Sequence, residues 1–293
     1  MLDQSLIPPQ RCSPRPPART VTVGFDGSRA SLAAVSWAAA EARRRGVALR
    51  LLHVWDLGPD VHSPLVGHGV PEADPRATAA RVRHDHPGLS VFTLDRCGEP
   101  ASVLCRAAGA SEMLVLGSRG LGGPAGFAVG SVALTVVART RRPIVLVRDP
   151  VPMTGGDVVL GLDLSHPCDE VLEFAFSHAN LRGAPLRVVH SPHPSGDHGP
   201  EAAGRGIPAD TAAASHRLAR VIDQWQHAFP GVRVTAEIRP GRTARQLLAA
   251  SGTAGLVVIG RRNRNSRLGP HTGVVNRTML HHCRVPMAVV PHD

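Results

Sequence analysis

The sequence predicts an α/β protein made of two similar domains in tandem, each with a parallel sheet covered by helices on both faces. Three observations support this prediction. The chain has 293 residues, enough for two domains of about 150 residues each. Short apolar runs rich in Val, Leu and Ile alternate with Ala-rich segments of helical periodicity, as is typical of strands buried between helices. The third observation is that the second half of the sequence repeats the first.

The two halves align without gaps over the first part of each. Val21–His53 aligns without gaps with Val158–His190, at a constant offset of 137. From Pro87 onward the offset is 143, so the second copy is longer in its middle. The expected segments are a disordered tail over residues 1–19, a domain over residues 20–149, a Pro- and Gly-containing linker over residues 150–156, and a second domain over residues 157–293.

The elements of the first copy follow in order from local patterns. Val21–Phe25 is a short β-rich run, and Ser31–Arg45 has apolar residues at helical spacing before Gly46, where a helix is expected to stop. A Gly-, Pro- and His-rich segment, Asp56–Pro75, is expected to be a loop before a short Ala- and Arg-rich helix. The other expected strands are Leu49–Trp55, Ser90–Leu94, Met113–Leu116 and Pro143–Val147, and the other expected helices are Glu99–Gly109 and Val132–Thr140.

Composition narrows the class of protein. The net charge is +10, but the basic residues are scattered and only 3% of residues are aromatic, so we expect no nucleic-acid partner. The five Cys are widely spaced, which argues against a disulfide framework or a zinc site and fits a reducing cytoplasm. The 16 His show no ligand spacing, so no metal is expected except Mg²⁺ accompanying a nucleotide. Without a signal peptide or an apolar run of about 20 residues, we expect a cytoplasmic protein without membrane contact.

Two segments leave predicted strands at the sheet edge where open parallel sheets bind ligands. The first, Gly24-Phe25-Asp26-Gly27-Ser28, offers the Asp26 carboxylate to ribose hydroxyls. The second begins at Gly117-Ser118-Arg119-Gly120 and reaches Gly130-Ser131 after nine further residues. Glycines let the backbone turn tightly and approach a ligand, and a helix that begins at Gly130-Ser131 presents free N–H groups and a hydroxyl to a phosphate.

These two segments resemble the universal stress protein family in its tandem arrangement. The spacing of Gly117, Gly120, Gly130 and Ser131 matches the family's ATP-type motif, and the resemblance covers nearly all of residues 21–291, twice. It implies Rossmann-like domains, each with five parallel strands in the flavodoxin-like order 3-2-1-4-5. It also implies that the last strands of the two domains pair, Ile144–Val147 with Met287–Val290.

The resemblance further implies a nucleotide-dependent stress-response regulator that binds ATP, with domain pairing and a possible homodimer. Carried onto this chain, Asp26 would hold the ribose and Val54 would contact the adenine through its backbone. The phosphates would be held by Gly117, Gly120, Gly130 and Ser131, with Arg119 and Val132 nearby. Two alternatives stay open: a slow ATPase or phosphotransferase that uses Ser131 and Asp26, and a nucleotide-free interaction module. A cyclic nucleotide is an alternative ligand.

The second copy departs from this pattern. It keeps Asp163, Gly260 and Gly273, but Asn263 replaces Gly120 and Val274 replaces Ser131. Asn tolerates positive φ, so Asn263 is expected to preserve the turn, whereas Val274 removes a hydroxyl donor. We expect weaker or no binding here. Asp163 is expected to be a helix N-cap, a role that is also the structural alternative for Asp26. The arginines expected to compensate by charge are Arg261, Arg262, Arg264 and Arg267.

Overall fold

The computed structural model describes residues 19–55, 74–118, 129–148, 155–166, 168–192, 207–263 and 273–293. The first half alternates strands and helices as predicted. Its elements are β1 (Thr20–Phe25), α1 (Arg29–Arg45), β2 (Ala48–Trp55), α2 (Pro75–Asp85), β3 (Val91–Cys97), α3 (Pro100–Gly109), β4 (Met113–Ser118), α4 (Ser131–Arg139) and β5 (Ile144–Arg148).

The second half repeats this succession with a longer helix in its middle. Its elements are β6 (Val158–Gly161), α5 (Asp169–Arg182), β7 (Leu186–His190), α6 (Ile207–Ala228), β8 (Val234–Ile238), α7 (Thr243–Ala250), a 3₁₀ turn (Ser251–Thr253), β9 (Leu256–Arg262), α8 (Val274–His282) and β10 (Met287–His292).

Helix ends follow the local chemistry that the sequence suggested. Gly46 and Gly183 are equivalent in the repeat, and they end α1 and α5 in the left-handed conformation with φ of 63° and 61°. Glu99 caps α3, because its carboxylate accepts from the backbone N–H groups of Ala101 and Ser102 at 2.9 and 2.8 Å. The predicted stop at Gly46 is confirmed, and the predicted start at Glu99 proves to be the cap of that helix.

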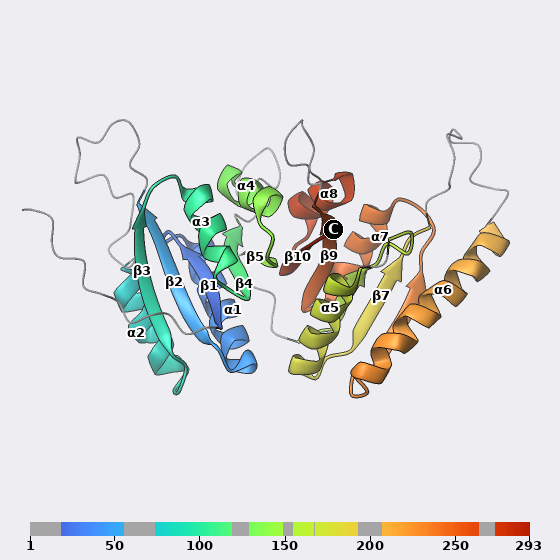
Figure 1. Ribbon diagram of the computed structural model, residues 1–293, viewed down its shortest axis with the longest axis horizontal. Helices are drawn as coiled ribbons and strands as arrows, with labels where there is room; N and C mark the ends of the chain where they lie inside the picture. The colour runs from blue at the N-terminus through green and yellow to red at the C-terminus, as the bar shows by residue number, and fades with distance from the viewer. Residues whose placement is uncertain are drawn as a thin grey trace, which may run out of the picture.

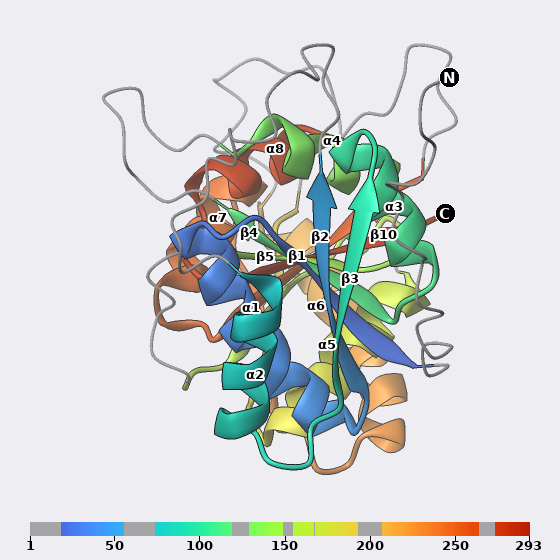
Figure 2. The ribbon, with the colours of Figure 1, turned by 90° about the vertical axis from the view of Figure 1, so that its left-hand side faces the viewer.

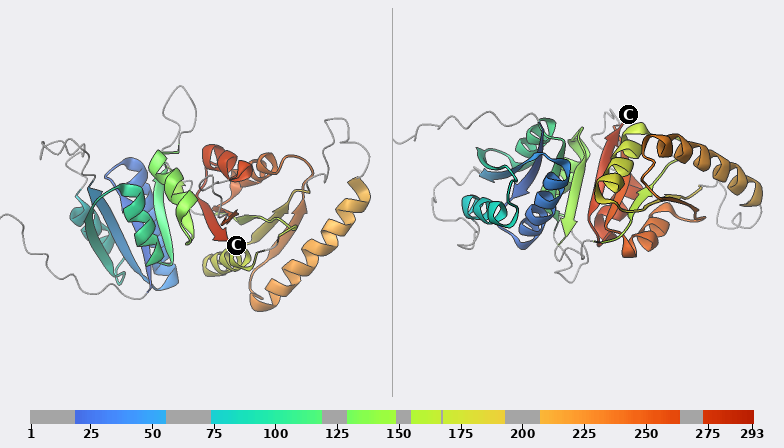
Figure 3. Two further views of the ribbon diagram at one scale, coloured as in Figure 1. Left: turned by 45° about the horizontal axis from the view of Figure 1, so that its top comes forward. Right: turned by 90° about the horizontal axis from the view of Figure 1, so that it is seen from below.

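All strands join in one 10-stranded sheet in the order β3-β2-β1-β4-β5-β10-β9-β6-β7-β8 (Figure 1). Within each half the strands are parallel, and the order 3-2-1-4-5 is confirmed. The single antiparallel contact among these strands joins β5 to β10, as predicted. The sheet therefore runs through both halves without an edge between them, as the views along other directions also show (Figure 3).

The register of the β5–β10 pair reveals an approximate two-fold axis. Val145 lies opposite Ala288, and the neighbouring pairs on each side are placed symmetrically around it. Val145 and Ala288 are equivalent positions of the repeat, at the offset of 143. The two halves therefore meet as an isologous pair, like the subunits of a two-fold dimer.

Helices cover both faces of the sheet (Figure 2). One core lies under α1, α2, α5 and α6, and the other lies under α3, α4, α7 and α8. Each core contains buried residues from both halves, so the apolar interior on each face is shared across the β5–β10 seam. Among the helices described, none is long and apolar enough to cross a membrane.

A buried polar cluster joins α1 to α5 across the two-fold axis. His178 Nδ1 lies 3.1 Å from Glu41 Oε1, and both side chains are fully buried. Arg45 Nε donates to Glu41 Oε1 at 2.7 Å, and the rings of Trp37 and Phe174 both stack on His178. Burial alone would raise the pKa of Glu41, but the contacts with His178 and Arg45 lower it to about 2. Burial lowers the pKa of His178, which favours the neutral imidazole.

Candidate functional site

In each half the strand order reverses beside the first strand. β1 lies between β2 and β4, and β6 lies between β7 and β9. Because parallel strands end at the same edge, β1 and β4 end side by side in the first half, and β6 and β9 do so in the second. Each half therefore has one candidate ligand site at its carboxyl edge.

Asp26 follows β1 in the first half and is exposed in a turn. Its Oδ1 accepts from the backbone N–H of Ser28 at 3.0 Å. The N-cap of α1 is Ser28, whose hydroxyl accepts from the Ser31 N–H at 3.2 Å, so Asp26 is not the cap. Burial alone would raise the pKa of Asp26, but the hydrogen bonds from Ser28 and Ser31 hold it below its usual value. Asp26 is therefore an ionised acceptor at the ligand edge.

Gly130 and Ser131 begin α4 at this edge. Gly130 is the N-cap and provides no side-chain hydrogen bond to the first turn, and a Cβ at this position would meet no atom within 4 Å. Ser131 is exposed, and Val132 is 37% exposed. Within the part of the chain that the structure describes, no side chain caps the amino end of α4, which presents backbone N–H groups and one hydroxyl. Arg119 and Gly120, predicted to act beside them, lie outside the described residues.

Gly117 lies within β4, opposite Val147 of β5, and not in a turn after the strand. A Cβ on Gly117 would come within 2.6 Å of backbone atoms of Ala30 and Ser31, because the first turn of α1 packs directly on this part of β4. The predicted tight turn at Gly117 is therefore wrong, and the glycine is required by packing. Val54 lies near the end of β2 and packs against the core under α3 and α4.

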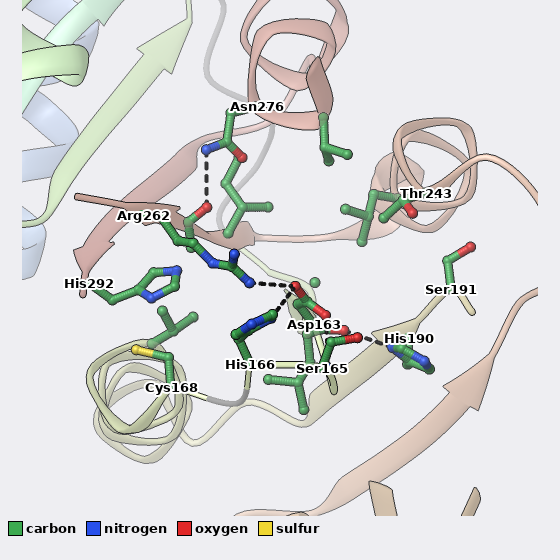
Figure 4. A pocket seen from close by; sticks show the side chains of 17 residues that line it. Asp163, Ser165, His166, Cys168, His190, Ser191, Thr243, Arg262, Asn276 and His292 are labelled. Carbon is green, nitrogen blue, oxygen red and sulfur yellow. Dashed lines mark hydrogen bonds and ion pairs between the residues drawn. The ribbon is translucent and has the colours of Figure 1, made fainter. Parts of the chain in front are cut away.

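The second half contains a cavity of about 470 Å³ at the corresponding edge. Apolar side chains form part of its wall, and polar groups from five strands and helices face it (Figure 4). The polar residues that line it are Asp163, Ser165, His166, His190, Ser191, Thr243, Arg262, Asn276 and His292. The size falls within the range of small-molecule pockets, so we next ask which of these groups are available to a ligand.

Asp163 already has two side chains of the second half beside its carboxylate. Arg262 Nη2 donates to its Oδ2 at 3.4 Å, and His166 Nδ1 lies 3.8 Å from the same oxygen (Figure 4). Its other oxygen accepts from the Ser165 N–H at 2.9 Å. The expectation that Asp163 is a helix N-cap is wrong, since α5 begins later, at Asp169, with Cys168 as the cap position.

Two buried polar side chains of the cavity are also bound to the protein itself. The Ser191 hydroxyl lies 2.7 and 2.8 Å from the backbone carbonyls of Arg239 and Gly241, to which it donates. Asn276 Nδ2 donates to the Gly260 carbonyl at 3.0 Å, which ties the start of α8 to the end of β9. At the equivalent positions the first half has Val54 and Ala133. These polar replacements stabilise the second half internally.

The two buried histidines of the cavity also lie beside backbone carbonyls of the protein. His190 Nδ1 lies 3.0 Å from the Leu162 carbonyl, and His292 Nδ1 lies 3.1 Å from the Asp293 carbonyl. The thiol of Cys168 is held protonated, because burial and its hydrogen bond to Glu170 raise its pKa to about 11. In the described part of the chain, no group of three or more His, Cys, Asp or Glu side chains is placed to hold a metal ion.

The substituted loop of the second half also differs from expectation. Among the described residues only glycines have positive φ, so the predicted left-handed conformation of Asn263 is wrong. Its side chain instead donates to Asp293 Oδ1 at 3.0 Å and accepts from Arg261 Nη2 at 2.9 Å. Gly273 does have positive φ, 72°, and Val274 beside it is 83% exposed.

The arginines expected to compensate by charge serve different purposes. Arg262 lines the cavity, but its guanidinium contacts Asp163. Arg261 is buried and points across the seam to the Thr140 carbonyl of the first half, so its expected role at the second site is wrong. Arg264 and Arg267 lie outside the described residues. The sequence carried no signal for the Arg261 contact, or for the positions of Asn276 and His292 at the cavity, because each depends on how segments distant in the sequence pack together.

Comparisons with known proteins agree on the family. The model of the universal stress protein family matches residues 17–148 and again residues 156–291. A universal stress protein of Mycobacterium tuberculosis is 31% identical over 285 residues, covering 92% of this chain and 96% of the relative. One from Mycolicibacterium smegmatis is 29% identical over 286 residues, with the same coverage of 92% and 96%.

A solved structure shows the same fold. The crystal structure of a universal stress protein from Archaeoglobus fulgidus superimposes with a TM-score of 0.71, covering 94% of this chain and all (100%) of that one. The two sequences are 19% identical in this alignment, so the likeness concerns the fold.

Proposed function

The chain belongs to the universal stress protein family, and we propose that it is an ATP-responsive regulator whose nucleotide site lies in the first half. In this proposal the nucleotide is bound as a signal and is not consumed. The described residues of the site are Asp26, Val54, Gly117, Gly130, Ser131 and Val132.

One observation carries the proposal. The uncapped amino end of α4, with Gly130 and Ser131, opens at the sheet edge where β1 delivers the ionised carboxylate of Asp26. Free N–H groups at a helix start attract phosphate, and a carboxylate nearby suits ribose hydroxyls. Val54 at the end of the neighbouring strand would contact the base through its backbone. Any Mg²⁺ would arrive with the nucleotide.

The second half supports the proposal by contrast. Asp163, Ser191 and Asn276 already bind groups of the protein itself, and the position of Ser131 is taken by Val274. A ligand there would have to break these contacts before making its own. We therefore propose that the second half binds nucleotide weakly or not at all and serves mainly as the pairing partner of the first.

The chemistry of Asp26 favours a regulator over an enzyme. Hydrolysis of ATP needs a group that orients or deprotonates water. Hydrogen bonds from Ser28 and Ser31 lower the pKa of Asp26, which makes its carboxylate a weak base. If the protein were instead a slow ATPase, purified chain incubated with ATP and Mg²⁺ would release ADP, measured by chromatography against Ser131→Ala as a control.

Calorimetric titration with ATP and Mg²⁺ tests the site. We expect the wild-type chain to bind, and Ser131→Val to weaken binding about ten-fold or more, because a hydrogen bond to a charged group is lost. Thr135→Val is the matched control, because its exposed hydroxyl lies one turn further along α4 and donates to the Ser131 carbonyl. Thr135→Val should bind like the wild type.

Two results would contradict the proposal. The first is absence of binding by the wild-type chain together with absence of nucleotide, by ultraviolet absorbance, in denatured freshly purified protein. The second is equal affinity of Ser131→Val and wild type, which would place the ligand elsewhere. In that case Asp163→Ala would locate it, since this change affects only the second cavity.

A further inference from the structure

The carboxyl end of α4 is held by a side chain from the other half of the molecule. Arg261, at the end of β9, is 5% exposed, and its Nη2 donates to the carbonyl of Thr140, the residue that ends α4. The same nitrogen donates to Asn263 Oδ1 at 2.9 Å. Within the described ranges Arg261 forms no ion pair, so its charge faces carbonyl oxygens and the negative end of the α4 dipole.

The rest of α4 is held by apolar packing, because Ala133, Val136 and Val137 are buried in the core that it shares with α3. The helix has 9 residues, about 14 Å at 1.5 Å per residue. Among the described residues, no side chain caps its amino end at Gly130, and none has an atom within 4 Å of the place where a Cβ of Gly130 would be. Apolar packing holds the helix against the core but is not directional, so the polar contact at its carboxyl end adds a fixed point that helps to orient it.

We infer that Arg261 of the second half is a positioning residue for the ligand site of the first half. By holding the carboxyl end of α4, it sets how the amino end of the helix presents Ser131 and its free N–H groups to phosphate. The inference rests on the proposed function of that site. It makes the affinity of one half depend on a side chain of the other, so domain pairing becomes part of the site.

A second arginine crosses the same seam in the opposite direction. Arg148, at the end of β5, is 6% exposed, and its Nη2 donates to the carbonyl of Leu280 in α8 at 2.5 Å. It matches Arg261 in burial and in reaching a carbonyl near the end of a helix, but the helix that it contacts, α8, belongs to the second half. Arg148→Met is therefore a control for the cost of losing a buried arginine at the seam.

Calorimetry with ATP and Mg²⁺ on the full chain tests the inference, with Ser131→Val identifying the first-half binding event. Arg261→Met should raise the Kd about five- to ten-fold. Arg261→Lys should recover most of the affinity, because an ammonium can still donate to the Thr140 carbonyl. Arg148→Met should leave the Kd within about two-fold, although both Met variants lower the midpoint of unfolding in denaturant without ligand.

The outcomes separate positioning from stability. Equal weakening by Arg261→Met and Arg148→Met, or no weakening by Arg261→Met, overturns the inference. If Arg261→Met does not fold, Asn263→Ala replaces it, because this change removes the second acceptor that orients the guanidinium. Asn263→Ala should raise the Kd about two- to three-fold, and an unchanged Kd overturns the inference. Absence of ATP binding by the wild type instead overturns the proposed function itself.

Discussion

The two halves of the chain share one fold, but they differ where they face each other and where each would face a ligand. Glu41 and His178 are equivalent positions of the repeat, at the offset of 137, and they meet at the two-fold axis. In a pair of identical domains the same residue would face itself, two buried carboxylates or two imidazoles. Here one half supplies the anion and the other the imidazole, so each half has become complementary to its partner.

The carboxyl edges of the two halves, where each has its candidate ligand site, also differ, but there the difference does not make the halves complementary. In the first half Asp26 accepts from a backbone N–H in its own turn and sits at the edge with the uncapped start of α4. In the second half the equivalent Asp163 contacts Arg262 and His166, and the cavity's buried amide and hydroxyl bind backbone carbonyls. The second half thus uses polar groups at this edge for its own internal contacts, whereas the first half has the edge at which we propose nucleotide binding.

The largest effect on stability is expected from a substitution that removes the complementarity of Glu41 and His178 at the two-fold axis. His178→Glu places two buried carboxylates against each other and should lower the free energy of unfolding by about 3–5 kcal/mol. The double change Glu41→His with His178→Glu should recover most of this loss. The reason is that Arg182 stands four residues after His178, as Arg45 stands four residues after Glu41. Chemical denaturation measures both, and a double variant no more stable than the single one would contradict the symmetry.

Acid should weaken the same contact. The pKa of Glu41 lies at about 2 in the folded state against an ordinary 4.5, so its stabilisation is complete above pH 4.5 and is lost as the pH falls toward 2. The pKa of folded His178 lies below its ordinary 6.5, so the unfolded chain binds its proton first and stability also falls below pH 6.5. The Glu41 contribution is on the order of 3 kcal/mol.

The pH dependence is measured by denaturation at pH values from 7 downward. Glu41→Gln is the control, because the amide does not titrate. Its stability should change less between pH 4.5 and 2 than that of the wild type. Parallel profiles of the two proteins would show that other carboxylates cause the acid sensitivity.

A smaller loss of stability is expected when the equivalent glycines near the ends of β4 and β9 are replaced by alanine, and the loss should differ between the two. A Cβ on Gly117 would meet backbone atoms of α1 at 2.5 Å, whereas a Cβ on Gly260 would meet the flexible imidazole of His292 at 2.9 Å. Gly117→Ala should therefore cost about 3 kcal/mol and Gly260→Ala about 1 kcal/mol. Thermal or chemical denaturation compares them, and equal costs would show that the α1 backbone can move away.

The smallest expected effect concerns the two equivalent serines after β1 and β6. Ser28 caps α1 through its hydroxyl, so Ser28→Ala should cost about 1 kcal/mol. Ser165 engages Asp163 through its backbone N–H and caps no helix, so Ser165→Ala should change stability by less than about 0.5 kcal/mol. Denaturation curves with equal losses would indicate that the Ser28 hydroxyl contributes no more than a surface group.

Much of the fold could be predicted because its signals are local. Local patterns placed the strands of the first half and the helices α1, α3 and α4 within a few residues of the observed elements, and Gly46 ended α1 as glycine chemistry suggests. The site was predicted less well. Gly130 and Ser131 lie at a helix start as expected, but Gly117 proved to be a packing residue, and Asp163 and Asn263 took roles that the motif did not indicate.

The sequence by itself thus determined the duplication, the alternation of elements, and the loss of one hydroxyl at Val274. Only the tertiary structure decided that Glu41 meets His178 and that Arg261 reaches Thr140, 121 residues away in sequence. The repeat of the two halves, the spacing of apolar residues and the residue types at turns can be seen directly in the sequence, because each depends on residues that are close together along the chain or on a comparison of its two halves. Which side chains meet across the two-fold axis depends on how complete sheets and helices pack, and no short segment encodes that arrangement.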